Sequence, residues 1–145
     1  MLKTILPAFI LIYSSLINSF AQSADEAAIK SIITSAYIEG IQNNGNIDDI
    51  RNGFHPSFSM LRLIDNEVKP FAIEEWITAI EKRKKEGNVS SVRTEGKFIT
   101  VDITGSVAIV KLELYRQGKK TFTDYLVLYK FNEGWKIVSK TYYRH

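Results

Sequence analysis

Few side chains in this sequence could carry acid–base or covalent chemistry. It has no cysteine and two histidines, His55 and His145. Thiolate nucleophiles, disulfides and clustered metal-ligand spacing are therefore absent, and we expect neither a metal nor a cofactor. His55 titrates in a useful range and could act as an acid or base. It could equally be a hydrogen-bonded residue at the end of a helix.

Two other polar residues interrupt apolar patterns. Tyr37 lies on the apolar stripe of a predicted helix, where its hydroxyl could meet a backbone carbonyl or donate to a ligand. Asp124 interrupts an apolar strand, as a catalytic carboxylate would. The predicted strand pairing instead places Asp124 opposite Lys111, with Lys140 one strand away, and this favours a cross-strand ion pair.

The first 21 residues are typical of a secretory signal peptide. Lys3 precedes an apolar run from Ile5 to Tyr13, and Ser19-Phe20-Ala21 supplies a cleavage site before Gln22. A membrane anchor is the alternative, but this run is shorter than the roughly 20 residues that a spanning helix needs. We expect an exported protein, periplasmic or secreted, with no membrane insertion after cleavage.

Composition limits the remaining possibilities. The chain has 145 residues, 24% of them charged, and a formal net charge of +3. That surplus is too small to indicate nucleic-acid binding, which needs basic residues concentrated on one surface. The length predicts that residues 22–145 form a single domain.

Hydrophobic periodicity predicts helices first and strands afterwards, which is an α+β order. A helix follows Ser23 and ends at Asn43-Asn44-Gly45, and a second begins after Asn46 and ends before Pro56. The other predicted elements are a hairpin of 58–64 and 67–69, a helix from residue 73 to Gly87, and strands at 91–95, 97–103, 107–115, 121–131 and 135–143.

Turn lengths predict which side chains share a face of the sheet. A two-residue turn at Gln117-Gly118 pairs Lys111 with Asp124, and a three-residue turn at 132–134 pairs Tyr125 with Thr141. Odd-numbered residues from 123 to 141 would then face the helices. The opposite face, which includes Lys111, Asp124, Leu126 and Lys140, mixes charge with apolar residues and suits a sheet-to-sheet homodimer.

This order of elements resembles the cone-shaped nuclear-transport-factor-2-like fold, which ketosteroid isomerases and SnoaL-like polyketide cyclases share. Five stretches resemble more specifically the bacterial family labelled "putative lumazine-binding": 37–40 (YIEG), 54–56 (FHP), 75–77 (EWI), 122–126 (FTDYL) and 135–142 (WKIVSKTY). The resemblance implies three helices packed on a curved antiparallel sheet, with a small-molecule pocket in the cone.

The ketosteroid isomerase branch is matched only in part. Tyr37 matches the tyrosine that donates to the substrate oxygen in those enzymes. The general-base carboxylate and the second oxyanion donor would fall near Arg62 and Val127, which supply neither group. Enolisation needs a base and a stabilised oxyanion, so this comparison argues against the isomerase reaction.

Aromatic and soft apolar residues could line the opening of such a cone. We predict that the ligand is small and mostly apolar or aromatic. The predicted ligand contacts are Tyr37, His55, Met60, Trp76, Tyr125, Val127 and Tyr143.

Three functions remain open from the sequence. The leading hypothesis is a small-molecule-binding protein without catalysis. An isomerase- or lyase-type enzyme would use Tyr37 with His55 as its acid–base pair. A dimeric scaffold with a filled cone is the third.

Overall fold

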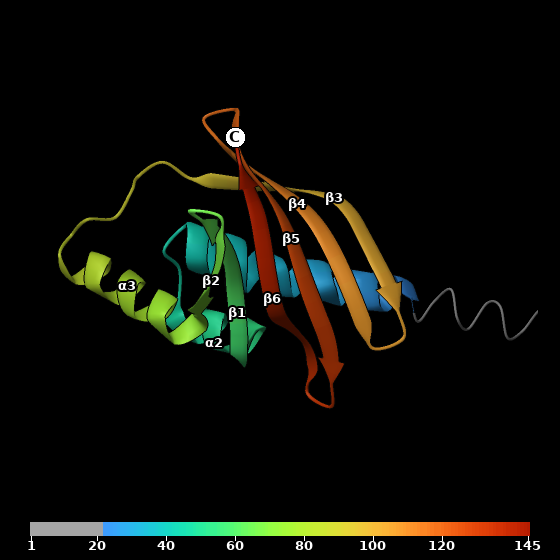
Figure 1. Ribbon diagram of the computed structural model, residues 1–145. Coiled ribbons are helices and arrows are strands. Elements are labelled where there is room, and N and C mark those ends of the chain that lie inside the picture. The colour runs from blue at the N-terminus through green and yellow to red at the C-terminus, as the bar shows by residue number, and fades with distance from the viewer. Residues whose placement is uncertain (1–21) are drawn as a thin grey trace, which may run out of the picture.

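A computed structural model of the chain describes residues 22–145, so the predicted signal peptide lies outside the described residues. Helices cover the concave face of one curved, open sheet of six strands in the order β2-β1-β6-β5-β4-β3 (Figure 1). The strands are β1 (Phe54–Ile64), β2 (Glu67–Ala72), β3 (Thr94–Thr104), β4 (Val107–Arg116), β5 (Lys119–Phe131) and β6 (Gly134–Arg144). The predicted α+β class and the cone-shaped architecture are confirmed.

The helices follow the predicted apolar stripes. Residues 22–32 are α-helical and continue into the π-helical segment η1 (Ile33–Gln42), which runs behind the strands in Figure 1. The side chain of Asn46 caps α2 (Ile47–Gly53) by accepting a hydrogen bond from the Asp48 amide. Gly53 allows α2 to pack closely on η1, because a β-carbon there would lie 2.2 Å from that of Ala36.

The third helix, α3 (Ile73–Lys85), lies beside the short β1–β2 hairpin (Figure 1). Asp65 and Asn66 form the hairpin turn in left-handed conformations, with φ of 52° and 61°. None of the helices among residues 22–145 is long and apolar enough to cross a membrane.

The sheet is not antiparallel throughout, because β1 runs parallel to its neighbour β6. The other adjacent strands are antiparallel. Where two strands were predicted at 91–95 and 97–103, the structure has the single strand β3, which begins at Thr94 and bends through a bulge near Phe98.

The predicted pairing of β4 with β5 is wrong by one residue. Arg116 pairs with Lys119 as expected, but a β-bulge at Thr121 then pairs Leu114 with Phe122. Asp124 consequently lies opposite Leu112 rather than Lys111. A one-residue shift turns every following side chain to the other face of a strand.

A second bulge, on β6, changes which of its residues face the cone. Phe131 pairs with Gly134 across a two-residue turn, so the predicted three-residue turn is also wrong. A bulge at Val138 restores the predicted pairing of Tyr125 with Thr141. Trp135 and Ile137 are buried before this bulge, and Lys140 is buried after it.

The predicted outer face therefore needs correction. Asp124 and Leu126 have no exposed surface and Lys140 is 4% exposed, so all of them point into the cone. Tyr125 and Tyr129 are instead 43% and 46% exposed on the outer face, where Lys111 pairs with Tyr125. The bulge at Thr121 is the physical reason for the reversal on β5, and the bulge at Val138 turns Lys140 of β6 into the cone.

Candidate functional site

The cone is hollow at one end. A cavity of about 330 Å³ lies between the helices, the β1 strand and the ends of β4, β5 and β6. This volume falls in the range of sites for small organic ligands. Its walls are formed by Tyr37, Ile41, Gln42, Asn44, Met60, Trp76, Arg83, Asn88, Ser90, Arg116, Phe122, Lys140 and Tyr142.

Aromatic rings enclose the ammonium group of Lys140 on the cavity wall. Its Nζ lies 4.5 Å from the ring centre of Tyr142, 5.2 Å from that of Tyr37 and 5.7 Å from that of Trp76. The sulfur of Met60 is 3.9 Å away. Such a cage favours a cation at the position of Nζ.

Asp124 lies behind Lys140 and Tyr37 and does not form part of the cavity wall. Lys140 Nζ forms an ion pair with Oδ1 of Asp124 over 2.9 Å. The hydroxyl of Tyr37 donates to Oδ2 of Asp124 over 2.6 Å. The three residues therefore form one buried polar cluster.

Burial is the largest cause of the pKa shifts in this cluster. It raises the pKa of the Asp124 carboxyl, although the Lys140 charge and the Tyr37 hydroxyl act against the shift. It lowers the pKa of the Lys140 amine against the attraction of Asp124. Burial and the Asp124 charge also raise the pKa of the Tyr37 hydroxyl well above its usual value. The lysine and the carboxyl thus have closer proton affinities than the same groups in water.

Hydrogen bonds between polar side chains connect the cluster to the C-terminal end of β4. Gln42 donates from Nε2 to the Tyr37 hydroxyl over 3.1 Å and accepts at Oε1 from Arg116 over 3.3 Å. Arg116 also donates from Nε to the Thr94 hydroxyl over 2.8 Å. Because both the nitrogen and the oxygen of the Gln42 side-chain amide have a partner, these bonds determine the orientation of Gln42 and of the Tyr37 hydroxyl.

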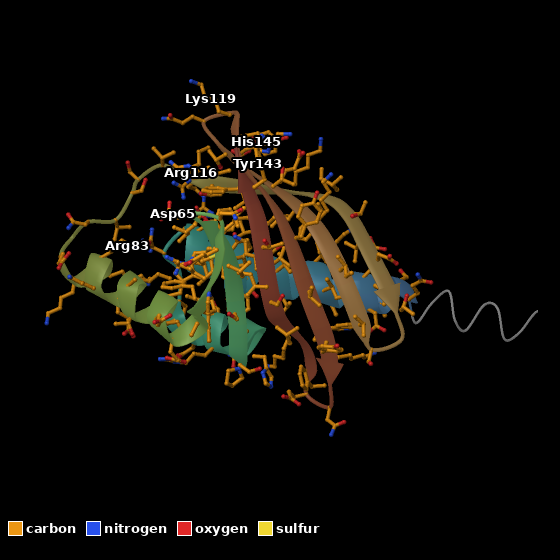
Figure 2. The ribbon with its side chains drawn as sticks, viewed as in Figure 1. Asp65, Arg83, Arg116, Lys119, Tyr143 and His145 are labelled. Atoms are coloured by element: carbon orange, nitrogen blue, oxygen red, sulfur yellow. The ribbon has the colours of Figure 1, made fainter. Side chains whose placement is uncertain are left out.

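Two arginines add positive charge around the cavity. Arg116 comes from the end of β4, close to the β4–β5 turn, and Arg83 comes from α3 (Figure 2). Within residues 22–145, neither lies within 4.0 Å of a carboxylate oxygen. Both are therefore available to a negatively charged ligand group.

Residues 24–143 match the protein family described as "putative lumazine-binding". The chain belongs to this family. The match spans nearly all of the described chain and confirms the resemblance drawn from the five sequence stretches.

Solved structures show the same fold at low sequence identity. A nuclear-transport-factor-2-like protein from Silicibacter pomeroyi has a TM-score of 0.69 at 18% identity, over 86% of this chain and 98% of that one. A cystatin-like-fold domain from Nostoc punctiforme has a TM-score of 0.63 at 20% identity, over 84% and 78%. A protein from Shewanella frigidimarina described as a putative ketosteroid isomerase has a TM-score of 0.59 at 18% identity, over 80% and 94%.

One curated relative has a named activity. The protein "Aldolase FrzH" from a Cladobotryum species is 26% identical over 118 residues, which cover 79% of this chain and 90% of that protein.

In this member of the family described as "putative lumazine-binding", the cavity wall includes some of the predicted ligand contacts. Tyr37, Met60 and Trp76 all line the cavity, although their contact with a ligand stays a prediction. The cavity also argues against the filled cone of the scaffold hypothesis.

Other predicted contacts lie elsewhere. Tyr125 and Val127 are on the outer face because of the bulge at Thr121, and Tyr143 is 65% exposed near the end of β6 (Figure 2). The ring of His55 stacks on Phe131 at 4.8 Å, outside the cavity wall.

The predicted acid–base pair of Tyr37 and His55 is therefore not formed. The Nδ1 atom of His55 is 2.7 Å from the hydroxyl of Ser57, two residues further along the chain. Asp124 and Lys140 take the places beside Tyr37 that the prediction gave to His55.

Sequence reasoning missed Gln42, Arg83, Arg116 and Tyr142 and misplaced Lys140. One signal was available on β5, where the even-numbered positions carry Leu126 and Leu128 and the odd-numbered ones carry Tyr125 and Tyr129. Leucine is buried completely more often than tyrosine, so the even-numbered face was the better candidate for the core. Asp124 belongs to that face.

Proposed function

We propose that this protein is exported, binds a small carbonyl compound in its cone and catalyses an isomerase- or lyase-type reaction on it. The observation that carries the proposal is the buried cluster of Asp124, Lys140 and Tyr37, in which Lys140 and Tyr37 line the cavity and Asp124 lies behind them. A charged pair is costly to bury, and a chain under no functional demand would gain little from keeping it.

Lys140 is the member of the ion pair that faces the ligand. In its ammonium form it can donate to a carbonyl oxygen, and in its amine form it can accept a proton from the adjacent carbon. Asp124, behind it, can hold the proton that the amine gives up, because burial raises the pKa of this carboxyl. The pair therefore suits proton transfer next to a carbonyl group.

The rest of the cavity indicates what else the ligand carries. Trp76, Tyr142 and Phe122 offer aromatic surface to a flat ring, while Arg83 and Arg116 offer charge to a carboxylate or phosphate. The "lumazine-binding" label of the family agrees with a flat heterocyclic ligand. The relative named as an aldolase agrees with chemistry beside a carbonyl, since an aldol reaction needs a nucleophilic carbon at that position.

Binding can be tested with Trp76 as the reporter. The chain has two tryptophans, and Trp135 lies outside the cavity wall, so Trp135→Phe leaves Trp76 as the only indole. Lumazine and 4-acetylbenzoate should each change its fluorescence saturably. The matched Tyr125→Phe variant, altered on the outer face, should bind equally. Absence of a saturable change with both probes, with no ligand seen by native mass spectrometry of protein from its own host, would contradict the proposal.

Catalysis can be tested by hydrogen exchange. The methyl protons of 4-acetylbenzoate should exchange with deuterium faster in the presence of the protein, as followed by proton NMR. Lys140→Arg keeps the positive charge but holds its proton too tightly to exchange it, so it should bind the probe without accelerating exchange. Equal acceleration by Lys140→Arg would remove Lys140 from the acid–base role.

The outer sheet face supports a proposal about assembly. Ile109, Tyr125, Tyr129 and Tyr143 are 50%, 43%, 46% and 65% exposed on this face. Apolar residues gathered on a sheet commonly mark an interface, so we propose a homodimer through this corrected face. Tyr129→Glu should produce a monomer by sedimentation or light scattering, whereas Glu95→Gln on β3 should leave the assembly unchanged.

Export rests on residues 1–21 and is tested separately. Expression of the full chain in a bacterial host should yield a periplasmic or secreted product whose N-terminus is Gln22. Lys3→Glu with Ala21→Arg should retain the precursor in the cytoplasm, because it removes the positive start and the small residue at the cleavage site.

A further inference from the structure

We propose that the Lys140 amine captures the carbonyl carbon of the ligand as an imine, so that the substrates are aldehydes or ketones. This inference rests on the proposed function and names the bond through which the same site would act. Among residues 22–145, which the structure describes, Lys140 is the one primary amine that lines the cavity. Desolvated lysines are the usual amines for this chemistry.

The aromatic cage fits the product as well as the free lysine. An iminium ion carries its positive charge on the same nitrogen as the ammonium that precedes it. The rings of Tyr142, Tyr37 and Trp76 and the carboxylate of Asp124 therefore stabilise the charge in both states. The positive charge is on the same nitrogen at the start and at the end, so no new charge has to be desolvated in the buried site.

The condensation balances within the ion pair. Asp124 accepts a proton from Lys140, and the lone pair of the resulting amine forms the C–N bond. The carbonyl oxygen gains a proton to give the carbinolamine. Asp124 then returns its proton, by way of the Tyr37 hydroxyl, to the carbinolamine oxygen. That oxygen leaves as water when the C–O bond breaks, and the iminium remains beside the Asp124 carboxylate. An ammonium and a carbonyl compound have become an iminium and water, and the total charge is unchanged.

A later proton transfer explains what Asp124 contributes. The iminium withdraws electrons from the adjacent carbon, whose proton can pass to the Asp124 carboxylate through the Tyr37 hydroxyl, which lines the cavity and lies 2.6 Å from Oδ2. The product is an enamine, a carbon nucleophile. The raised pKa of Asp124 supports this role, because a carboxylate with greater proton affinity is the stronger base.

A purely structural ion pair is the competing interpretation, and the molecule contains a reference for it. Lys130 is 2.7 Å from Oδ1 of Asp25 and 5.9 Å from the ring centre of Trp135, yet it lies outside the cavity wall. It has the same kinds of neighbours as Lys140 without a ligand space. If proximity to a carboxylate and a ring were sufficient, both lysines would react alike.

The test is reductive trapping on the intact protein. 4-Formylbenzoate is an aldehyde with a flat ring and a carboxylate, and sodium cyanoborohydride reduces its imines to stable amines. We expect one adduct by intact mass at neutral pH, assigned to Lys140 by peptide mapping. Labelling of Lys140 should exceed that of Lys130 by about tenfold or more, because the cavity holds the aldehyde beside the Lys140 amine and Lys130 lies outside the cavity wall.

Two variants make the result decisive. Lys140→Arg should lose the main adduct while still binding 4-acetylbenzoate, and Lys130→Arg should keep it. Labelling of Lys140 no greater than that of Lys130 would overturn the imine. If Trp76 reports binding and 4-acetylbenzoate exchanges its protons while no adduct forms, the imine is excluded and the non-covalent function stands. If neither probe binds, the proposed function fails together with the imine.

Discussion

Two lysine–carboxylate pairs in this protein have similar partners, but the pKa of the carboxyl is shifted in opposite directions in the two pairs. Asp25, near the start of the first helix, accepts from Lys130 over 2.7 Å and from the indole of Trp135 over 2.9 Å. Asp124 pairs with Lys140 at 2.9 Å and accepts from the hydroxyl of Tyr37 over 2.6 Å. Each carboxylate thus meets one lysine and one aromatic donor.

Solvent is what differs between them. The side chain of Asp25 is 20% exposed and that of Lys130 is 47% exposed, whereas the side chains of Asp124 and Lys140 are 0% and 4% exposed. The hydrogen bonds from Lys130 and Trp135 lower the pKa of Asp25, while burial raises the pKa of Asp124. The same kinds of groups therefore hold a helix on the sheet at the surface, whereas inside the cone they form a buried pair in which the pKa of the carboxyl is raised and the pKa of the amine is lowered.

Removing each carboxylate should show the largest contrast. Asp124→Ala leaves the Lys140 charge buried without a partner, and we expect a loss of about 3–5 kcal/mol in the free energy of unfolding. Asp25→Ala should cost about 1 kcal/mol, because Lys130 is free to turn into water and one hydrogen bond of Trp135 is lost. Urea unfolding followed by circular dichroism measures both. Similar losses in the two variants would contradict the distinction between the pairs.

Replacing both partners of the buried pair should return most of that stability. In Asp124→Leu with Lys140→Met, no charge remains to be desolvated, and we expect unfolding free energy within about 2 kcal/mol of the original chain. The same double variant should lose the adduct and the proton exchange described above. A double variant as unstable as Asp124→Leu alone would show that packing, and not charge, holds this part of the cone.

The sequence predicted the elements well because their signals are local. The Asn46 cap, the Asp65-Asn66 turn and the apolar stripe around Tyr37 depend on neighbouring residues, and all three of these features are present. The position of Asp124 depends instead on a bulge at Thr121, where Tyr115 pairs with Lys120 and Leu114 with Phe122. No turn residue marks that bulge, so counting from the hairpin turn gave the wrong face.

The site was missed for a related reason. Lys140 enters the cone only because a second bulge, at Val138, reverses the alternation of β6 after Ile137. Bulges often lie beside functional sites, where they redirect a side chain. The prediction that Asp124 forms an ion pair was right about the kind of contact and wrong about its place, since the partner is Lys140 inside the cone.

The pH dependence of stability should have opposite signs at the two carboxylates. The lowered pKa of Asp25 gives stability that is complete above its unfolded value of about 3.9 and is lost as the pH falls through the folded value. The raised pKa of Asp124 means that the folded state holds the proton more tightly. Its contribution therefore becomes less favourable as the pH rises from about 3.9 through the folded value.

Asp25→Asn and Asp124→Asn separate these two effects. The stability difference between the original chain and each variant, measured by urea unfolding from about pH 3 to about pH 7, should rise with pH for Asp25 and fall with pH for Asp124. At Asp124 this stability difference should change by about 1.4 kcal/mol for each unit by which the folded and unfolded pKa values differ. The change should be smaller at Asp25, which is partly exposed to solvent. Slopes of the same sign would contradict the assignment.

The smallest expected effect concerns Gln42, a residue that supports the buried pair and has no counterpart at the Asp25 pair among the described residues. Gln42 donates to the Tyr37 hydroxyl and accepts from Arg116, and the Asp25 pair has no such intermediary among its hydrogen bonds in the described part of the chain. Gln42→Leu removes both bonds from a partly buried position, and we expect a loss of about 1 kcal/mol in unfolding free energy. Because Tyr37 and Asp124 remain bonded to each other, the adduct at Lys140 should still form. Loss of that adduct would mean that the Gln42 side chain positions both the tyrosine and the ligand. The functional cluster would then include Gln42 and Arg116.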